Sequence, residues 1–384
     1  MEFDPQLSTQ LLINSLGDEA LAKAAAYTSG NHWLMAGSLM VSLVVAWLLI
    51  RSQLLVRLND RLAQRGFFIR SFAVCAAFLV LSSIMELPWS VYANWWRETQ
   101  YGRTSQPLAD YLGQSGIGLA TNALLMGLFF TAVYALIGRA GRQWWLWSGG
   151  LTAAFVAGVL LLSPVVLEPL FNDYQPVPEG EVRDAVEAMA KDANIPLDRV
   201  FMFDGSRQSN NFTANVSGIG ASARIAISDV ALNEASLDEV KAVTGHEVGH
   251  YVLGHIWYLV GSLTLVVMAG FFIADKLFAP VARLFGASAD ISDPAGLPVL
   301  LVIVGLLVTL AQPINYAVSR ANETAADQYS LETVNLPDAL ATALVKTAEY
   351  RNPRPSALEE MLFYTHPSVE RRVRMAMEWK AIHP

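Results

Sequence analysis

The stretch SLDEVKAVTGHEVGHYVLGHIWYLVGSLTLVVMAGFFIA, residues 236–274, joins the two features that decide the fold of this chain. Ser236 followed by Glu239 matches a capping box, which predicts that a helix begins near Leu237. Residues 256–274 then carry no charge. A helix of that length crosses the roughly 30 Å of hydrocarbon in a bilayer. The stretch therefore predicts a water-exposed helix that is followed directly by a membrane span.

Five further apolar runs extend this pattern over the chain: residues 33–50, 71–96, 117–138, 143–167 and 294–319. The chain is 53% hydrophobic and 16% charged, whereas soluble proteins average about 25% charged residues. Several runs end in aromatic clusters such as Trp95-Trp96, as is typical of membrane interfaces. We therefore predict an integral membrane protein, mainly α, with about six transmembrane helices. Glu86 interrupts the run 71–96. It is either a functional carboxylate within the membrane or a group near the membrane interface, where Pro88 kinks the helix.

The charge and the cysteine content exclude several classes of function. With 26 Lys and Arg residues against 34 Asp and Glu residues, the formal charge is −8. The chain thus has no surplus of cations to neutralise phosphates, and we expect no nucleic-acid partner. Cys75 is the single cysteine, which excludes a disulfide framework and a multi-cysteine metal site.

The sharpest motif is His246-Glu247-Val248-Gly249-His250. Positions i and i+4 share one face of a helix, so both imidazoles can reach one zinc ion, and Glu247 stands beside the open fourth position. Zinc lowers the pKa of a bound water toward about 7, and the glutamate can take the proton so that hydroxide attacks a carbonyl. The alternative is two surface histidines on a helix.

Two later segments can complete this site. Glu323 and Asp327 share a helix face directly after the last apolar run, so Glu323 can be the third ligand and Asp327 can accept the second ring N–H of a ligand histidine. An ordinary solvated acidic helix is the alternative for that segment. His366 and Arg372 could stabilise negative charge on a tetrahedral intermediate, although a surface histidine before a proline is common.

These motifs divide the chain into membrane and soluble parts. We expect an N-terminal extramembrane segment (1–32), a four-helix membrane region (33–167), a soluble zinc-peptidase part with the metal motif (168–255), two membrane helices (256–319) and a C-terminal helical part that completes the zinc site (320–384). In the first soluble part, a helix is predicted over 179–194 and strands over 200–203 and 223–227. The fold class is thus a membrane scaffold with a split α+β zinc-peptidase domain and a small sheet.

The order of these motifs resembles the type I CAAX prenyl protease family of integral-membrane zinc metallopeptidases. Besides the metal motif, the resemblance rests on Glu168-Pro-Leu-Phe-Asn172, Asp204-Gly-Ser206, Ser319-Arg320 with Glu323 and Ala326-Asp327, and His366-Pro367 with Arg372. It implies that His246, His250 and Glu323 bind one zinc per chain, that Glu247 is the general base, and that His366 and Arg372 contact the substrate. One departure is Thr213-Ala214, where the family has Asn-Ala. The substrate-binding edge strand would then include Thr213, Ala214 and Asn215.

The resemblance also implies a peptide or protein substrate, with prenylated C-terminal CAAX peptides as the substrate named by the family. In a host without prenylation, turnover of membrane proteins is the alternative task. A membrane channel or transporter with a zinc-stabilised soluble domain and a catalytically silent zinc scaffold are further alternatives, and the intact Glu247 argues against the second. His255 lies nine residues after His246, so we expect it on another face in a structural role. The resemblance implies an active site on the cytoplasmic side. Lys and Arg residues near the span ends number nine on the side opposite the active site and six on the side of the active site. Because positive residues are enriched on the cytoplasmic side, this count favours an active site outside the cytoplasm.

Overall fold

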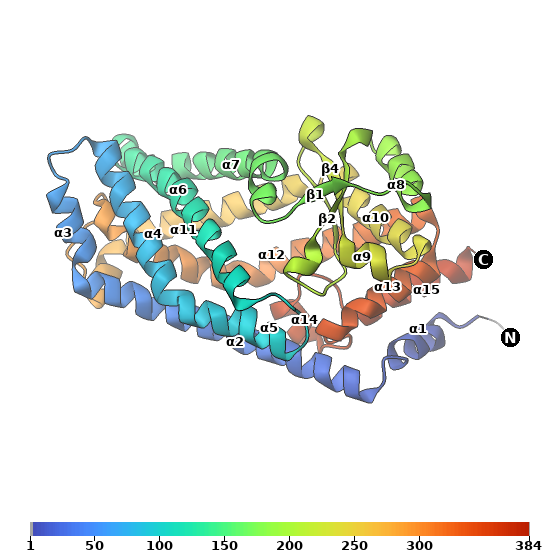
Figure 1. Cartoon of the computed structure of the whole chain (residues 1–384). Helices are drawn as coiled ribbons and strands as arrows, with labels where there is room; N and C mark the ends of the chain where they lie inside the picture. Colours follow the sequence, from blue (N-terminus) through green and yellow to red (C-terminus); the bar gives the residue numbers. More distant parts are fainter. Residues whose placement is uncertain (1–2, 384) are drawn as a thin grey trace.

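The computed structural model describes residues 3–383, apart from the side chain of Glu349, and most of them are helical. Long apolar helices lie side by side in the half of the molecule drawn on the left of Figure 1. They are α2 (Asp18–Ser52), α4 (Phe67–Val91), α6 (Leu108–Ala140), α7 (Trp144–Leu162), α11 (His255–Phe285) and α12 (Leu297–Val334). The short helix α3 (Leu54–Arg61) connects the first two at the far end.

The described part of the chain contains five stretches that are long and apolar enough to cross a membrane. One of them, Leu108–Leu170, is a hairpin of two helices, because the chain turns between α6 and α7 at Gly141, whose φ is +53°. Every apolar run predicted from the sequence lies within one of these stretches. The mainly helical, membrane-embedded fold is therefore confirmed.

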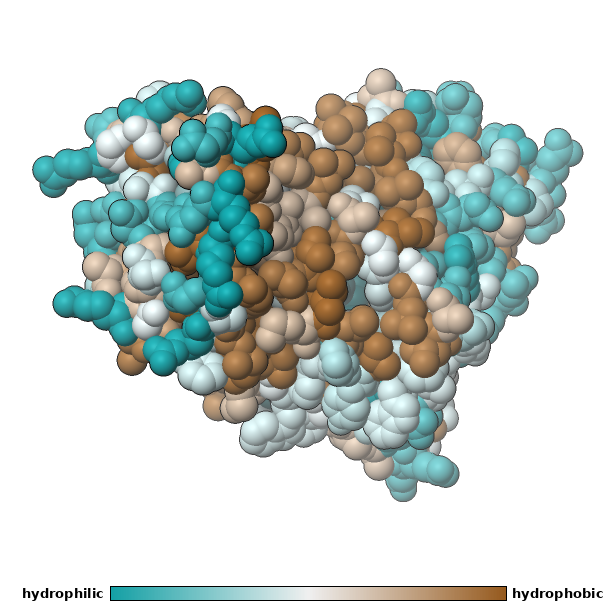
Figure 2. All heavy atoms as spheres, turned by 60° about the vertical axis from the view of Figure 1, so that its left-hand side comes forward, coloured by the Kyte–Doolittle hydropathy of each residue, from teal (hydrophilic) through white to brown (hydrophobic). Residues whose placement is uncertain are grey.

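The membrane helices pack in a closed succession, in which α2 contacts α4, α4 contacts α6, α6 contacts α7, α7 contacts α11, α11 contacts α12, and α12 returns to α2. Their shared core contains buried side chains such as Val74, Phe130, Val133, Phe271 and Leu300. Figure 2 shows the outer surface of this half as an apolar area between hydrophilic areas at its two ends. That distribution suits a protein whose middle faces lipid and whose ends face water.

Helix α12 is too long to be a membrane span alone. Its 38 residues correspond to about 57 Å at 1.5 Å per residue, almost twice the thickness of the hydrocarbon. The helix therefore continues without a break from the membrane half into the half that carries the sheet (Figure 1). Its residues are also more buried, since 56% of its most apolar 18-residue stretch is buried inside the protein, compared with 11–28% for the other candidate spans.

The sheet has four short strands in the order β1-β2-β4-β3. The strands are β1 (Tyr174–Pro176), β2 (Val200–Phe203), β3 (Ala214–Ser217) and β4 (Arg224–Ser228). β2 and β4 run parallel, and β1 and β3 flank them antiparallel. The two central strands correspond to the two strands expected from the sequence, and the small sheet is confirmed. β3 is an edge strand, so one side of its backbone has no neighbouring strand within the sheet.

The helices beside the sheet are α8 (Glu181–Asp192), α9 (Asp229–Glu234) and α10 (Leu237–Val252). Side chains such as Val186, Ile225, Ile227 and Val248 form their common core. Helix α10 begins at Leu237 with the predicted capping box, in which the Ser236 hydroxyl accepts the Glu239 N–H and the Glu239 carboxylate accepts the Ser236 N–H. This reciprocal pair fixes the start of the helix that bears the metal motif.

The C-terminal helices pack against the other side of α10 and α12. They are α13 (Pro337–Thr347), α14 (Ala357–Phe363) and α15 (Val369–Ile382), and the N-terminal helix α1 (Pro5–Asn14) lies against α13 and α15. Ile13, Leu331, Leu340 and Met377 are buried between them. Both ends of the chain therefore lie at the sheet end of the molecule (Figure 1).

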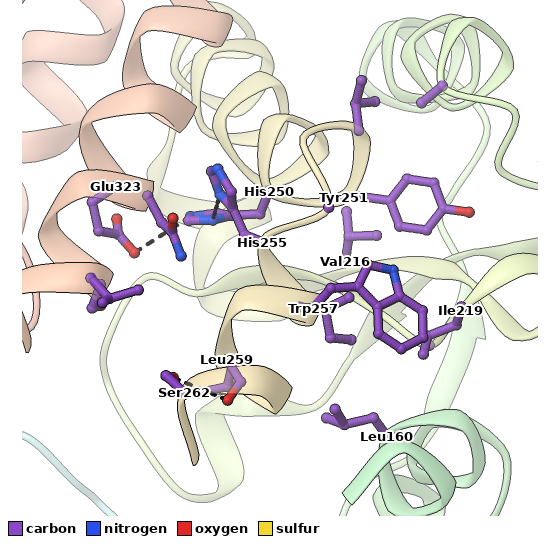
Figure 3. A pocket seen from close by; sticks show the side chains of 18 of the residues that line it. Leu160, Val216, Ile219, His250, Tyr251, His255, Trp257, Leu259, Ser262 and Glu323 are labelled. Carbon is purple, nitrogen blue, oxygen red and sulfur yellow. Dashed lines mark hydrogen bonds and ion pairs between the residues drawn. The ribbon is translucent and has the colours of Figure 1, made fainter. Parts of the chain in front are cut away.

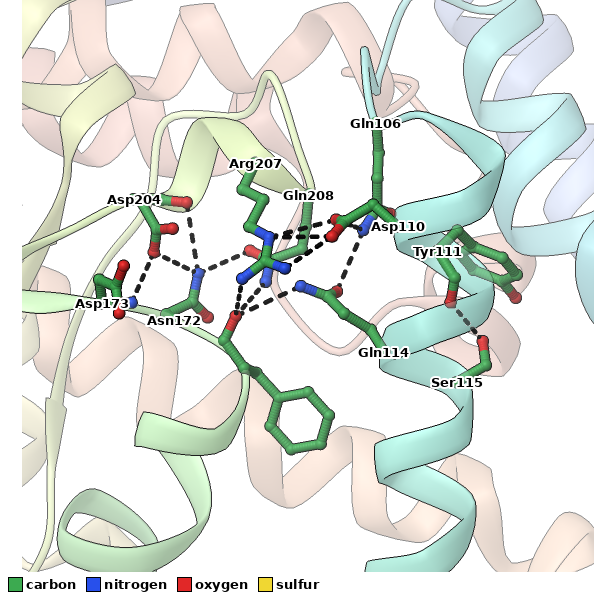
Figure 4. Close-up of polar contacts among 11 residues, drawn as sticks. Gln106, Asp110, Tyr111, Gln114, Ser115, Asn172, Asp173, Asp204, Arg207 and Gln208 are labelled. Carbon is green, nitrogen blue, oxygen red and sulfur yellow. Dashed lines mark hydrogen bonds and ion pairs between the residues drawn. The ribbon is translucent and has the colours of Figure 1, made fainter.

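Polar contacts attach the sheet half to the start of α6 (Figure 4). The Arg207 guanidinium donates to the Asp110 carboxylate, with the shortest contact 2.6 Å, and to the Phe171 carbonyl at 3.4 Å. The Asn172 amide donates to Asp204 and Gln208 at 3.0 and 2.8 Å. The segment that leads into the edge strand β3 is thus held by the membrane half, although the two are about a hundred residues apart in sequence.

Candidate metal centre

Two helices cross closely to form the centre, because small residues of α10 face α12. A Cβ atom on Gly245 would lie 2.6 Å from the Val334 Cγ2 atom, and one on Gly249 would lie 3.0 Å from the Tyr329 ring. The absence of side chains at these two positions lets the backbones approach. The first histidine of the motif on α10 is thereby brought against the acidic face of α12.

The three residues predicted as metal ligands come together at this crossing. His246 Nε2 lies 3.1 Å from His250 Nε2. The Glu323 carboxylate lies 3.2 Å from His246 Nε2 through one oxygen and 3.4 Å from His250 Nε2 through the other. One ligand atom from each of the three residues lies within 4.8 Å of the others. The site thus gathers two imidazoles and one carboxylate around a common point.

The donor atoms fit a metal ion better than they fit one another. The two ring nitrogens face each other at close range, and the buried Glu323 Oε2 atom accepts no hydrogen bond from the described residues. A tetrahedral zinc with Zn–N distances of about 2.0–2.1 Å separates two ring nitrogens by roughly 3.3 Å, which is close to the spacing here. A cation at this point would satisfy all three groups at once.

Asp327 and Arg372 lie on the other side of His246. The Asp327 carboxylate is 2.8 Å from His246 Nδ1, and the Arg372 guanidinium donates to both Asp327 oxygens at 2.7 Å. All three residues are buried. Such a carboxylate fixes the tautomer and the orientation of a ligand histidine. Arg372 is therefore paired with Asp327 rather than with Glu370, which pairs with Arg354 and Arg374.

The remaining predicted groups lie beside the three ligands. Burial raises the pKa of Glu247, against the opposing effect of His246 and His250. His366 Nε2 is 3.3 Å from the unsatisfied oxygen of Glu323, and its Nδ1 contacts the Thr365 hydroxyl at 2.8 Å. Burial lowers the pKa of His366 to about 3. A neutral His366 with Nε2–H is a hydrogen-bond donor aimed at the centre.

His255 contacts a ligand histidine, which the sequence alone did not indicate. Its Nδ1 atom lies 2.8 Å from the Nδ1 atom of His250, the nitrogen that points away from Glu323. Helix α10 ends at Val252, and Gly254 adopts a left-handed conformation with φ of +68°, so the chain reverses its course before His255. Counting residues along one helix therefore placed His255 on a different face.

A cavity of about 700 Å³ borders the ligands on the side of His250. Figure 3 shows His250, His255 and Glu323 at one side of it and Trp257, Ile219 and Leu160 at another. The apolar walls come from the membrane helices α7 and α11 and from the loop after β3. The centre can thus receive an apolar group that approaches from the membrane half.

Of the expected substrate-binding residues, Ala214 and Asn215 lie on the edge strand and Thr213 directly precedes it, but none of the three lines the cavity. Thr213 is held by Ser228, whose hydroxyl accepts the Thr213 N–H at 3.2 Å and whose N–H donates to the Thr213 carbonyl at 2.9 Å. Ala214 packs in the sheet core, and the Asn215 Oδ1 atom is buried without a hydrogen bond from the described residues. The cavity is lined instead by the far end of the strand and the residues after it, Val216, Gly218 and Ile219.

The segment 168–172, which is part of the family resemblance, anchors the same end of the strand through Glu168. The Glu168 carboxylate forms an ion pair with Arg224 and accepts the Ser217 hydroxyl at 3.2 Å. Arg224 also lies over the Tyr174 ring at 3.7 Å. These contacts fix the position at which β3 leaves the sheet and meets the cavity.

Glu86 lies away from this centre, among the membrane helices. Its carboxylate accepts the Ser42 hydroxyl at 2.9 Å, and both residues line a cavity of about 300 Å³ between α2, α4 and α12. No described residue pairs Glu86 with a cation.

Comparison with known proteins gives consistent matches over nearly the whole chain. Residues 176–380 match the model of peptidase family M48, and residues 7–173 match that of the "CAAX prenyl protease N-terminal, five membrane helices" family. The chain is 30% identical over 316 residues to the "uncharacterized metalloprotease YhfN" of Bacillus subtilis, covering 80% of this chain and 74% of that protein. It is 26% identical to CAAX prenyl protease 1 of Saccharomyces cerevisiae, covering 82% and 75%. The crystal structure of S. mikatae Ste24p superposes with a TM-score of 0.77 at 21% identity, covering 94% and 90%.

Proposed function

Because the chain belongs to peptidase family M48 and is a membrane-embedded metalloprotease, we propose that it is a zinc endopeptidase that cleaves peptide bonds between α10 and α12. The observation that carries the proposal is the convergence of His246, His250 and Glu323, with one buried Glu323 oxygen left without a hydrogen bond. One zinc ion per chain fits this donor set. When bound, zinc supplies a Lewis acid for the scissile carbonyl and lowers the pKa of a bound water.

The chain's own residues would perform the remaining steps. Glu247 takes the proton of the attacking water and returns it to the leaving amine as the C–N bond breaks, and its raised pKa brings it closer to the working pH, where a general base is most effective. His366 donates from Nε2 to the carbonyl oxygen as that oxygen gains negative charge. Asp327 and Arg372 hold His246 in the tautomer that presents Nε2 to the ion.

The substrate would be a peptide or protein that lies along β3 as an added strand. The apolar cavity beside His250 supports a substrate with an apolar group next to the scissile bond. We propose that this group comes from a membrane-associated polypeptide, either a prenylated C-terminal CAAX segment or an apolar segment of a membrane protein. We also propose, from the family resemblance, that the centre faces the cytoplasm. The arginine-containing loop at α3 then lies on the other side of the membrane, contrary to the positive-inside rule.

A single substitution tests the chemistry. Glu247→Gln keeps the shape of the side chain but cannot take a proton, so zinc content should stay near one per chain while peptide hydrolysis falls roughly a hundredfold or more. Glu332→Gln, at an exposed carboxylate on α12, is the matched control and should retain activity. Unchanged turnover by Glu247→Gln would exclude the proposed base.

Two further measurements separate the substrate alternatives and the orientation. One CAAX peptide is offered with and without its prenyl group, and the cleavage sites are mapped by mass spectrometry. Cleavage that requires the prenyl group supports CAAX processing, and equal cleavage supports turnover of membrane proteins. A reporter fused to the C-terminus should report a cytoplasmic location, and a reporter active only outside the cytoplasm would overturn the orientation.

A further inference from the structure

A second, smaller cavity borders the metal centre on the side of His366. It has a volume of about 250 Å³ and lies between the N-terminal half of α2 and the segments before and after α14. His366 belongs to both sites, because it lines this cavity and its Nε2 atom lies 3.3 Å from Glu323. The two cavities therefore flank the three metal-ligand residues, with His250 on one side and His366 on the other.

The two cavities differ in chemistry. The larger one is lined by the carboxylates of Asp192 and Glu323 and by no described Lys or Arg. The smaller one has a cation and several hydrogen-bonding groups, and none of the described side chains that line it is an Asp or a Glu. The cation is Arg351, and Asn31 and Thr365 are among the polar residues of the wall. The volume is below the roughly 300–1,000 Å³ of pockets that enclose a whole ligand. It suits one end, or one side chain, of a longer molecule.

Arg351 is half-buried, and its contacts differ from those of the buried arginines Arg372 and Arg224. Arg372 is paired with Asp327, and Arg224 with Glu168. For Arg351, the contact found among the described residues is with the Tyr350 ring, 6.0 Å from its guanidinium carbon, and no ion pair is formed. Burial lowers the pKa of Arg351, and the neighbouring charge of Arg372 acts in the same direction, while Tyr350 and Glu323 act against them. A cation that is partly removed from water without a counter-ion is costly, and an anionic ligand would offset that cost.

We propose that this cavity binds a carboxylate of the peptide substrate, and that Arg351 pairs with it. The guanidinium presents two parallel N–H groups that match a carboxylate, which makes arginine the usual partner for this group. Because His366 forms part of the same wall, the carboxylate is held at a fixed distance from the scissile bond. The cavity thus selects where a peptide is cut relative to its negative charge. This inference rests on the proposed endopeptidase function.

The carboxylate can be the C-terminus of the substrate or an Asp or Glu side chain near its end, and three peptides distinguish these sources. The first is a prenylated CAAX peptide with a free C-terminal carboxylate, the second is its C-terminal amide, and the third is the amide with Asp as the last residue. Binding is measured by fluorescence anisotropy to the Glu247→Gln protein, which does not depend on turnover. Hydrolysis by the unaltered protein is measured in parallel.

We expect the free acid or the Asp-containing amide to bind about tenfold or more tightly than the plain amide. Arg351→Met should remove this preference and leave the affinity for the plain amide unchanged, and Arg351→Lys should restore part of it. Arg354→Met is the matched control, because this exposed arginine lies three residues away and pairs with Glu370 instead. It should keep the preference. The melting temperature of each variant shows whether the fold is intact.

Equal binding of all three peptides by the parent protein would overturn the proposal. So would an Arg351→Met variant with an intact melting temperature that loses affinity for the acid and for the amide alike, because the residue would then not recognise charge. If the free acid is preferred in binding but no peptide is hydrolysed by the unaltered protein, the carboxylate site stands and the endopeptidase function fails. If the peptides are hydrolysed without any preference for a carboxylate, the endopeptidase function stands and the carboxylate site fails.

Discussion

His250 has its Nε2 atom at the metal centre, and the orientation of its ring depends on His255 at the other nitrogen. His255→Ala should therefore weaken zinc binding by about 10- to 100-fold, the usual cost of removing a residue that orients a ligand histidine. His255→Gln keeps an acceptor and should lose less. Zinc retention in competition with a chelator measures both. His383→Ala, at an exposed histidine away from the centre, is the control.

His366 can act on the transition state or merely support the fold, and one variant separates the two. If its Nε2–H stabilises charge on the carbonyl oxygen, His366→Ala should lower kcat and kcat/KM together, by roughly 10²–10³, with zinc retained. If His366 only supports the fold, His366→Ala should leave kcat near normal and lower the melting temperature. Steady-state kinetics, zinc analysis and a melting curve on the same preparation decide between them.

The crossing of α10 and α12 depends on the lack of a side chain at Gly245. The added methyl group of Gly245→Ala would meet the Val334 Cγ2 atom at 2.6 Å and the Ser330 hydroxyl at 3.0 Å. The helices would have to separate, so we expect a loss of about 1–3 kcal/mol of stability and weaker zinc binding, because Glu323 moves away from His246. The control is Gly261→Ala on α11, where no atom lies within 4 Å of the added group. If Gly245→Ala binds zinc as tightly as the parent, the close approach does not position the ligands.

The capping box of α10 makes the stability of the metal helix depend on pH. Burial alone would raise the pKa of Glu239, but Lys346 at 2.8 Å and the Ser236 N–H lower it by more. A lowered pKa means that the charged carboxylate stabilises the fold above the ordinary value of about 4.3 and that this contribution is lost as pH falls through the lower folded value. Glu239→Gln should thus cost about 1 kcal/mol near neutral pH.

The same comparison at acid pH provides the check. The difference in unfolding free energy between the parent and Glu239→Gln should shrink as pH falls below about 4, because the parent carboxylate is then protonated as well. Thermal unfolding in detergent over a pH series measures it. A difference that grows toward acid pH would contradict the sign of this argument.

Across the whole molecule, the membrane helices and the central strands were predictable because their patterns are local. A bilayer requires uncharged runs of fixed length, and the capping box marks the start of α10 within the sequence itself. The groups that sequence left undecided depend on tertiary geometry. His255 reaches His250 only because the chain reverses at Gly254. Arg351 borders the centre only because three segments far apart in the sequence enclose one cavity.

The unbroken course of α12 has a mechanical consequence. The helix lies in the hydrocarbon with one half and holds Glu323 with the other, so it acts as a lever whose tilt is set by the lipid. Pro313 lies in its interior, before Glu323, and is the place at which this lever can bend. A hydrophobic helix that exceeds the local bilayer thickness tilts to shorten its span. The protein should therefore be sensitive to acyl-chain length. In vesicles of graded thickness, we expect hydrolysis and zinc affinity to pass through a common optimum, and activity that is flat across the series would show that the lever bends before it moves the ligand.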